Sequence, residues 1–280
     1  MINFCHIAPT PHLDLVEGRP VHLVLAHLIE QDDSYTEWYL KQKEIYGSTL
    51  IMDNSAFEMY KLNKPMYDPN RLIEMGKKVN ADYIVLTDYP GEPADRTIQM
   101  ASIQGPVFKE NGFGTFFVPQ GKKGDISDLL TSFMFASQSP ELIDYIGISI
   151  LAAPLAYNVE QGNNLQRFSS RLRLMHALKE RYFFQDVQDN FQKIHMLGML
   201  DGPNEVMFMN GFKKYIDTWD SSAGVWLGLN DQVFDNSPTG RMQGKFEEEV
   251  NFNYITKNNI SIEKAKKNMK YIDNLCKESS

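Results

Sequence analysis

The sequence predicts that residues 1–280 fold as one domain, a (β/α)8 TIM-type barrel of the α/β class. Short apolar, β-branched segments alternate with amphipathic segments up to about residue 220, which is the pattern of βα units around a parallel sheet. No GxGxxG turn follows the first strand, so an open doubly wound sheet is disfavoured. No linker rich in Pro, Gly or Ser divides the chain into domains.

Seven segments have the length and apolar composition of buried strands. These strands are predicted at residues 21–28, 48–55, 81–88, 114–120, 144–150, 193–199 and 215–220. The eighth strand has two candidates, residues 225–229 and residues 250–255. Apolar residues at three- and four-residue spacing predict helices between the strands. The clearest of these helices are predicted at residues 35–47, 69–80, 125–136 and 165–184, and the polar segment 229–250 is predicted to form a loop or lid.

The net charge of −8 argues against a protein that coats nucleic acid, because Lys and Arg supply most of the affinity for phosphates. A local basic surface is compatible with this charge, although a solvated helix face is the simpler interpretation of each basic cluster. The candidates are Lys122, Lys123, Arg167, Arg171, Arg173, Lys213, Lys214, Lys264, Lys266, Lys267 and Lys270.

The two cysteines, Cys5 and Cys276, lie at opposite ends of the sequence, so there is no CxxC pair and no disulfide framework. The six histidines are scattered, without HxxxH or HExxH spacing. We therefore expect no metal site and no structural zinc. The longest apolar run is too short to span a bilayer, and no basic start precedes an apolar stretch, so we expect a cytoplasmic protein.

Polar residues follow the apolar part of several predicted strands, namely Asp53, Asp88, Gln120, Ser149 and Asp220. The C-terminal ends of all strands in a barrel meet at one mouth, so these residues are expected to share a pocket. A single Asp at such a junction is also explained as a helix cap. Paired carboxylates can supply a nucleophile and a proton donor at a sugar carbon. Metal binding is the competing use, but no His-carboxylate cluster and no DxD spacing supports it.

In their order along the chain, these segments resemble motifs of the tRNA-guanine transglycosylases. DNSAFE resembles the family's DSGGFQ, which implies that Asp53 is the general acid/base residue. ADYIVLTDYP resembles the strand whose aspartate reads the guanine edge, which implies that role for Asp88. VPQGK resembles VQGG, whose glutamine helps to hold the base, which points to Gln120.

The second half of the resemblance concerns the base pocket and the nucleophile. YIGISI is similar to a glycine-bearing strand that lines the base pocket, which points to Gly147, and Ser149 at the end of this strand is a further substrate-binding candidate. MLGML, the helix after it and IDTWDS resemble LMGVG, a helix and VDMFDC. This match implies that Asp220 is the nucleophile and that Asp217 is the preceding aspartate of the motif. In an extended strand the two aspartates would face opposite sides, and Asp217 is the deeper one that can anchor a neighbouring strand.

Departures from the family pattern bear on the substrate. Ser55 and Ala56 replace the paired glycines, Glu58 replaces the final glutamine, and the PTR after the nucleophile is absent. The cysteine-rich zinc segment of the tRNA enzymes has no counterpart, which favours DNA over tRNA as the polymer. In what it lacks, the sequence most resembles the related 7-deazaguanine DNA transglycosylases of phages and bacterial genomic islands.

The resemblance implies exchange of guanine in a nucleic acid for a 7-deazaguanine through a covalent aspartyl-sugar intermediate, with neither ATP nor a redox cofactor. Phe57, Tyr89 and Trp219 flank the expected site as stacking candidates, although an aromatic residue beside a strand end is more often part of the core. A non-catalytic accessory subunit is disfavoured because both reactive aspartates are present. A phosphate-binding isomerase or aldolase is disfavoured because no phosphate loop and no strand-end lysine is evident. The sequence leaves open whether copies of the chain form a homo-oligomer.

Overall fold

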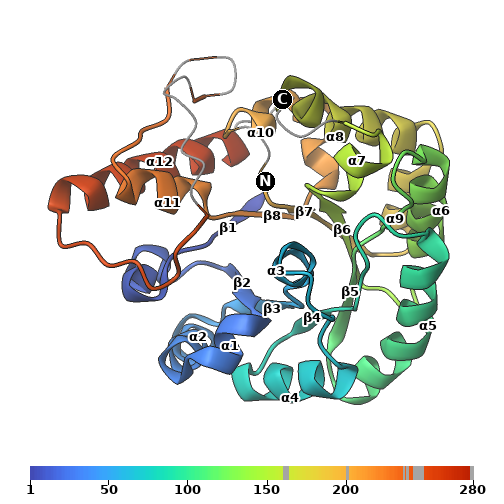
Figure 1. Ribbon diagram of the computed structural model, residues 1–280, viewed down its shortest axis with the longest axis horizontal. Helices are drawn as coiled ribbons and strands as arrows, with labels where there is room; N and C mark the ends of the chain where they lie inside the picture. The colour runs from blue at the N-terminus through green and yellow to red at the C-terminus, as the bar shows by residue number, and fades with distance from the viewer. Residues whose placement is uncertain (160–163, 200–201, 236, 238–239, 242–248, 278–280) are drawn as a thin grey trace.

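A computed structural model describes residues 1–159, 164–199, 202–235, 237, 240–241 and 249–277. Eight parallel strands form one sheet in the order β1-β8-β7-β6-β5-β4-β3-β2, and the end strands β1 and β2 lie against each other. The strands form a ring with helices outside it, which confirms the (β/α)8 barrel (Figure 1). The strands are β1 (Asn3–His6), β2 (Val21–Leu25), β3 (Thr49–Asp53), β4 (Tyr83–Val85), β5 (Gly114–Phe117), β6 (Tyr145–Ser149), β7 (Lys193–Leu197) and β8 (Thr218–Ser221).

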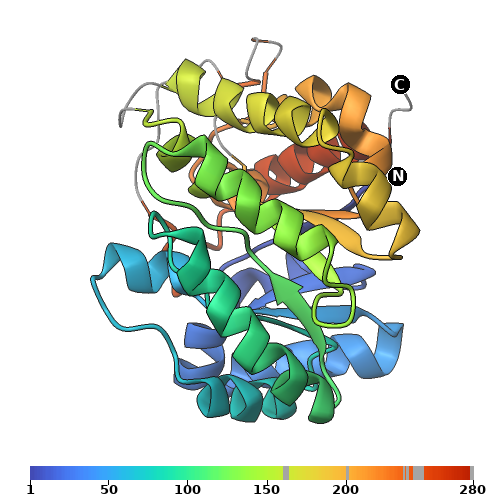
Figure 2. The same ribbon diagram turned by 90° about the vertical axis from the view of Figure 1, so that its right-hand side faces the viewer.

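Helices connect successive strands and cover the outside of the barrel in both views (Figures 1 and 2). One short helix, α3 (Ala56–Lys61), instead lies across the centre of the ring, at the end where the strands finish (Figure 1). The other helices are η1 (Thr10–Val16), α1 (Ala26–Gln31), α2 (Asp33–Tyr46), α4 (Pro69–Val79), α5 (Ala94–Glu110), α6 (Ile126–Ser137), α7 (Ala152–Ala156), α8 (Asn164–Lys179), α9 (Phe183–Asp189), α10 (Glu205–Phe208), η2 (Asn210–Tyr215), α11 (Ala223–Leu229) and α12 (Asn259–Lys277).

Two of the helix boundaries follow from local capping. The side chain of Asp32 accepts hydrogen bonds from the Ser34 and Tyr35 amides and so begins α2. At the other end of α2, Gly47 has φ +67°, the left-handed conformation that glycine adopts at low cost. The four clearest predicted helices are found at α2, α4, α6 and α8, with α9 forming the last part of the fourth prediction.

The eighth strand was predicted wrongly, because it is the N-terminal segment β1. Residues 225–229 lie in helix α11, and residues 250–255 form neither helix nor strand. A short apolar run does not by itself distinguish a strand from a buried helix, and all of 225–229 is buried. β1 pairs in parallel with β8, with Cys5 beside Asp220.

The segment predicted as a loop or lid, 229–250, forms no helix or strand after Leu229 in the part that the structure describes. Residues 236, 238–239 and 242–248 lie outside the described residues. The end of the segment contacts α3, since Lys61 Nζ lies 2.8 Å from Glu249 Oε1. Just beyond it, the Phe252 ring meets the edge of the His27 ring, with 5.7 Å between their centroids. The described end of this segment therefore lies at the same barrel end as α3.

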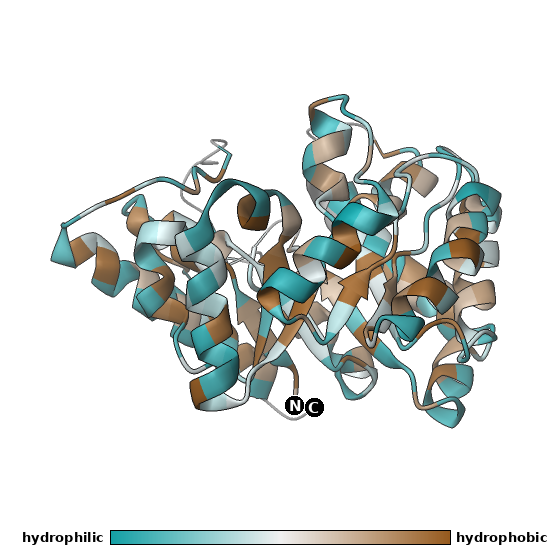
Figure 3. Cartoon of the chain, turned by 90° about the horizontal axis from the view of Figure 1, so that it is seen from below, coloured by the Kyte–Doolittle hydropathy of each residue, from teal (hydrophilic) through white to brown (hydrophobic). Residues whose placement is uncertain are grey.

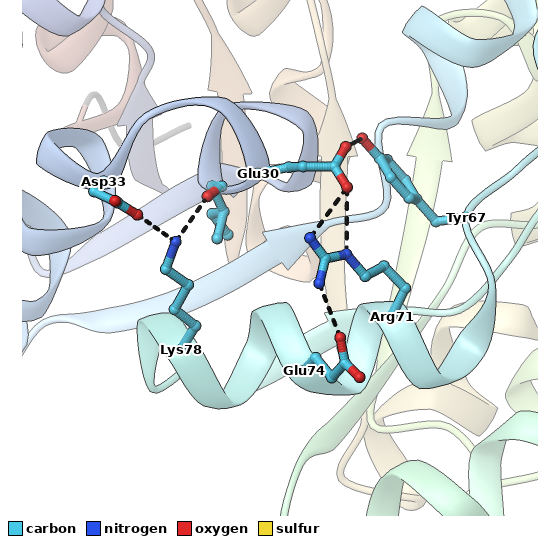
Figure 4. Close-up of polar contacts among 7 residues, drawn as sticks. Glu30, Asp33, Tyr67, Arg71, Glu74 and Lys78 are labelled. Atoms are coloured by element: carbon cyan, nitrogen blue, oxygen red, sulfur yellow. Dashed lines mark hydrogen bonds and ion pairs between the residues drawn. The ribbon is translucent and has the colours of Figure 1, made fainter.

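Polar contacts hold the segment after α3 against α1, as Figure 4 shows. Tyr67 Oη donates to Glu30 over 2.8 Å, and the Arg71 guanidinium lies 3.2 Å from the same carboxylate. Lys78 joins α4 to Asp33 at 2.6 Å. Each exposed pair contributes little to stability, but together they fix how the chain returns from α3 to the barrel wall.

The hydrophobic core fills the barrel and the layer between the strands and the helices. Figure 3 shows mostly brown, hydrophobic strands inside a shell in which many outer helix faces are teal. The start of β1 meets the end of α12, where the Ile2 amide donates to the Cys276 carbonyl over 3.5 Å. Both cysteines are buried and free. Among the described residues, no helix is long and apolar enough to cross a membrane.

Candidate active site

The strand ends bring five of the residues predicted from the sequence to one end of the barrel. Asp53 and Ser149 end β3 and β6, Asp220 lies near the end of β8, and Asp88 and Gln120 follow β4 and β5. This is the end at which barrel enzymes place their catalytic groups. The charges of Asp88 and Asp220 both act on Asp53, so the three carboxyl groups share one electrostatic environment.

Asp53 has the environment of a proton donor. Burial raises the pKa of its carboxyl well above the ordinary value, and the nearby charge of Glu58 raises the pKa further. The Ser55 amide donates to Asp53 Oδ2 over 2.8 Å, which opposes the rise without reversing it. A carboxyl group with a raised pKa can hold a proton near neutral pH and deliver it to a leaving group.

Asp88 lies in a polar cluster that is closed to solvent. Asn54 Nδ2 donates to Asp88 Oδ1 over 2.9 Å, and Gln120 Nε2 donates to Oδ2 over 2.7 Å. Burial raises the pKa of Asp88 to about 6, while the two amide donors lower it. Each carboxylate oxygen can accept a second hydrogen bond, and the buried Gln120 Oε1 has no partner among the described residues. The cluster therefore offers fixed acceptors to a ligand that carries N–H groups.

The carboxylate of Asp220 accepts hydrogen bonds on one of its two oxygens. His195 Nε2 lies 3.0 Å from Asp220 Oδ1, and the Gly198 amide donates to the same oxygen over 2.9 Å. Among the residues that the structure describes, both hydrogen bonds to this carboxylate go to Oδ1. Asp220 is 5% exposed. The arrangement leaves Oδ2 as the atom that can act on a substrate.

The Gly198 peptide is itself fixed by buried donors. Its carbonyl accepts from Arg171 Nη2 over 2.9 Å and from the Trp219 indole over 2.8 Å. Arg171 is fully buried, donates also to the Ile148 and Leu197 carbonyls, and pairs with Glu205 at 2.8 Å. The basic-surface prediction was therefore wrong for Arg171. Its charge ties the ends of β6 and β7 together.

The turn from β3 into α3 has a strained conformation. Ser55 has φ +58° and ψ +30°, a left-handed geometry that is unusual for a residue other than glycine. Its Oγ accepts from the His27 amide over 3.2 Å and lies 2.9 Å from His27 Nδ1. On the next turn, burial raises the pKa of Glu58, whose Oε2 is buried and has no partner within the described part of the chain. The turn thus places a further carboxyl group, Glu58, beside Asp53.

Two residues in the sequence-based set do not reach the mouth. Asp217 precedes β8 at the opposite barrel end, where its Oδ2 accepts from the Ile194 amide over 2.8 Å. That place fits an anchor between β7 and β8 and does not fit a substrate-binding residue. Gly147 lies in the middle of β6, and a Cβ there would meet the Phe116 ring at 2.5 Å. Glycine at this position is explained by packing inside the barrel.

The three aromatic candidates have separate positions. Trp219 is fully buried against Arg171 and belongs to the core. The Phe57 and Tyr89 rings are partly buried, and each carries a cation over its face, Lys61 at 4.3 Å and Arg96 at 3.7 Å. Both rings lie on the chain segments that leave the barrel mouth, so both stay candidates for stacking.

Four residues around the site were not predicted from the sequence: Asn54, Glu58, His195 and Arg171. Asn54 and Glu58 follow Asp53 within the DNSAFE segment, so the motif itself could have indicated them. His195 lies inside a strand, where a lone histidine is usually a core residue. Arg171 lies on an amphipathic helix with other cations, which gives no sign of burial. Within the described residues, no group of three or more His, Cys, Asp or Glu side chains is placed to hold a metal ion.

No known family model matches this chain, and no curated protein matches it. Among solved structures, it is similar to a putative fructose-1,6-biphosphate aldolase from Coccidioides immitis, with 10% identity and a TM-score of 0.48 over 97% of this chain and 88% of that one. A xylose isomerase domain containing protein from Salmonella typhimurium LT2 has 11% identity and a TM-score of 0.46, over 78% of this chain and 87% of that one. Human mitochondrial enolase superfamily member 1 has 11% identity and a TM-score of 0.42, over 75% of this chain and 41% of that one. These likenesses assign no reaction to the chain.

Proposed function

We propose that this barrel is a transglycosylase that replaces guanine in DNA with a 7-deazaguanine base. The observation that carries the proposal is the placement of three different carboxyl groups at one barrel mouth. Asp220 keeps Oδ2 available, Asp53 has a raised pKa, and Asp88 sits between two amide donors. A nucleophile, an acid and a reader of N–H groups are the three parts that base exchange requires.

In the first half of the reaction, Asp88 accepts hydrogen bonds from the N–H groups of the guanine edge, and Gln120 lies beside the same edge. Asp220 Oδ2 then attacks C1′ of the nucleotide. The C1′–N9 bond breaks, its electron pair goes to the base, and Asp53 supplies the proton that neutralises the departing guanine. The sugar is left as an ester of Asp220.

In the second half, a 7-deazaguanine occupies the same pocket. Its N9 proton goes to the Asp53 carboxylate, N9 attacks C1′, and Asp220 leaves as a carboxylate. One N-glycosidic bond replaces another, so the exchange needs no ATP and no redox cofactor. The target base must leave the helical stack to reach the pocket, at a cost of a few kcal/mol that the base contacts offset.

The turn at Ser55 supports the alignment with the DSGGFQ motif. The motif has glycine at this position, and here the residue has φ +58°, which glycine adopts without strain. A backbone conformation that suits glycine at this position is what the proposed alignment expects. Asn54 takes the place of the motif's serine and contacts Asp88 directly, which links the acid/base segment to the base-reading segment.

DNA is the proposed polymer because the zinc segment of the tRNA enzymes has no counterpart in the sequence. The test incubates the purified protein with DNA or tRNA that contains radiolabelled guanine and adds a 7-deazaguanine. We expect release of label from DNA and no release with the Asp220→Ala variant. Release of label from tRNA alone would mean that tRNA, and not DNA, is the polymer on which the enzyme acts. No release from either polymer, in single-stranded or duplex form, would contradict base exchange.

A further inference from the structure

His195 is buried in the barrel and lies within hydrogen-bond distance of the Asp220 carboxylate. The residue is fully buried in β7, where it is paired in register with Gly147 on one side and Thr218 on the other. Its Nε2 lies 3.0 Å from Asp220 Oδ1, and its Nδ1 lies 2.7 Å from Thr218 Oγ1. Both ring nitrogens therefore have a partner that is fixed by strand β8.

The partners indicate which ring nitrogen carries the proton. An ionised carboxylate can only accept, so Nε2 has to carry a hydrogen when Asp220 is charged. Thr218 Oγ1 in turn donates to the Tyr145 hydroxyl over 3.4 Å and continues the polar contacts into the barrel. The geometry thus places a hydrogen on Nε2, the nitrogen that faces Asp220.

The second donor to Asp220 Oδ1 is the Gly198 amide, and its direction is set by the rest of the site. Gly198 has φ +67°, and a Cβ at this position would meet Ile150 at 2.9 Å. Arg171 and Trp219 hold the carbonyl of the same residue. A nucleophile with two fixed donors on one oxygen has little freedom to rotate.

We propose that His195 is a positioning residue that, together with the Gly198 amide, holds Asp220 Oδ1 and presents Oδ2 to the anomeric carbon. The inference rests on the proposed transglycosylation. In the sugar ester, Oδ1 is the carbonyl oxygen. When the C1′–Oδ2 bond breaks, its electron pair returns to the carboxylate and negative charge spreads onto Oδ1, where the two N–H donors stabilise it.

The kinetic test compares His195→Leu, which removes the donor, with His195→Gln, whose amide can reach the position of Nε2. Single-turnover formation of the enzyme–DNA adduct should slow in His195→Leu, because Oδ2 is no longer held towards C1′. Displacement of the adduct by added 7-deazaguanine should slow by about 10²-fold, the usual effect of losing one donor to a developing negative charge, and His195→Gln should recover part of both losses. The dissociation constant for guanine should change little, because Asp88 and Gln120 bind the base. His22→Leu is the matched control, since this buried histidine faces Trp38 and Tyr39 on α2. Adduct formation at the wild-type rate in His195→Leu would overturn the proposal.

A second measurement does not depend on activity. Nitrogen NMR of the histidine rings should show a hydrogen on Nε2 of His195, and this Nε2–H signal should shift in Asp220→Leu. A ring protonated at Nδ1 alone, or one that does not respond to the loss of Asp220, would overturn the contact itself. A protein with the expected ring state but no base exchange would contradict the proposed function and leave the contact intact, so the two failures are distinguishable.

Discussion

The amide of Gln120 donates to Asp88 Oδ2 over 2.7 Å in a cluster where Asp88 is only 3% exposed. This contact favours the charged form of a carboxyl group whose pKa burial raises to about 6. The rise from 3.8 corresponds to about 3 kcal/mol against ionisation. The amide donors therefore lower the pH at which Asp88, buried as it is, becomes an acceptor for the base.

Replacing Gln120 with Leu should move the pH dependence of base binding. Guanine affinity in the wild type should rise with pH through about 6, because only the ionised Asp88 accepts from two N–H groups. Gln120→Leu removes a donor to the charged form, so the midpoint should move up by about one pH unit. Guanine binding is measured by calorimetry at several pH values between about 5 and 8, a range that includes the expected midpoint.

Gln104→Leu is the matched control, because this buried amide contacts Thr87 and lies in the same part of the barrel without touching Asp88. Its midpoint should equal that of the wild type. An unchanged midpoint in Gln120→Leu would show that Asp88 is not the group that governs base binding.

Asp53→Asn should slow adduct formation by about 10²- to 10⁴-fold, the usual contribution of a general acid. The Asn side chain can still accept from the Ser55 amide, so the fold should be retained. Single-turnover kinetics and the circular dichroism spectrum check the two statements. A folded variant with near-wild-type kinetics would remove Asp53 from the mechanism.

The same variant should change stability in a pH-dependent way. The pKa of Asp53 is higher in the folded than in the unfolded chain because burial and the charge of Glu58 raise it. The folded state then holds a proton that the unfolded state has lost, so this group stabilises at low pH and loses that effect as pH rises above about 4. The gain in unfolding free energy from Asp53→Asn should be larger at alkaline than at acidic pH. Denaturant unfolding at both pH extremes measures it, and an equal effect at both would contradict the raised pKa.

Two substitutions at Ser55 distinguish the effect of backbone strain from the effect of the side-chain hydrogen bonds. Ser55→Ala loses the hydrogen bonds to His27 and keeps a side chain in the left-handed region, whereas Ser55→Gly loses the same bonds and relieves the strain. The Gly variant should therefore be more stable than the Ala variant by about 1 kcal/mol. Thermal unfolding of the pair measures the difference. An Ala variant as stable as the Gly variant would mean that the turn is not strained.

Much of the fold was predictable from the sequence, because each βα unit carries a local pattern. The register that brings Asp53, Asp88 and Asp220 to one end follows from parallel strands alone. β1 was not predictable, since its four residues, Asn3–His6, have no periodicity, and the apolar run in α11 gives a stronger strand signal than β1. Tertiary contacts, which have no local signature, decide such short elements.

The site was predictable where it depends on strand ends and not where it depends on packing between strands. His195 and Arg171 are fully buried polar residues whose partners lie on other elements, and no sequence spacing indicates those partners. The place of Asp217 was predictable from strand alternation, which makes it the deeper aspartate, and its contact with the Ile194 amide is the anchor to a neighbouring strand that was expected.

Arg171→Met should lower the free energy of unfolding by about 3–5 kcal/mol, because it leaves the buried Glu205 without its Arg171 partner. The double variant Arg171→Met/Glu205→Leu should lose less than the sum of the single changes. Arg173→Met, an exposed arginine on the same helix, is the control and should lose no more than about 0.5 kcal/mol. Chemical denaturation of these variants and of Glu205→Leu gives the four values, and additivity would contradict a coupled pair.

The proposed exchange depends on one covalent step, in which Asp220 takes up the sugar. The most direct measurement mixes the enzyme with guanine-containing DNA, separates the mixture on a denaturing gel and maps the linked peptide by mass spectrometry. We expect an adduct on Asp220 that disappears in Asp220→Ala and persists in Asp217→Ala. The main effect of Asp217→Ala should be lower stability, through the lost contact with the Ile194 amide. An adduct on Asp217, or one that persists in Asp220→Ala, would contradict the proposed covalent step.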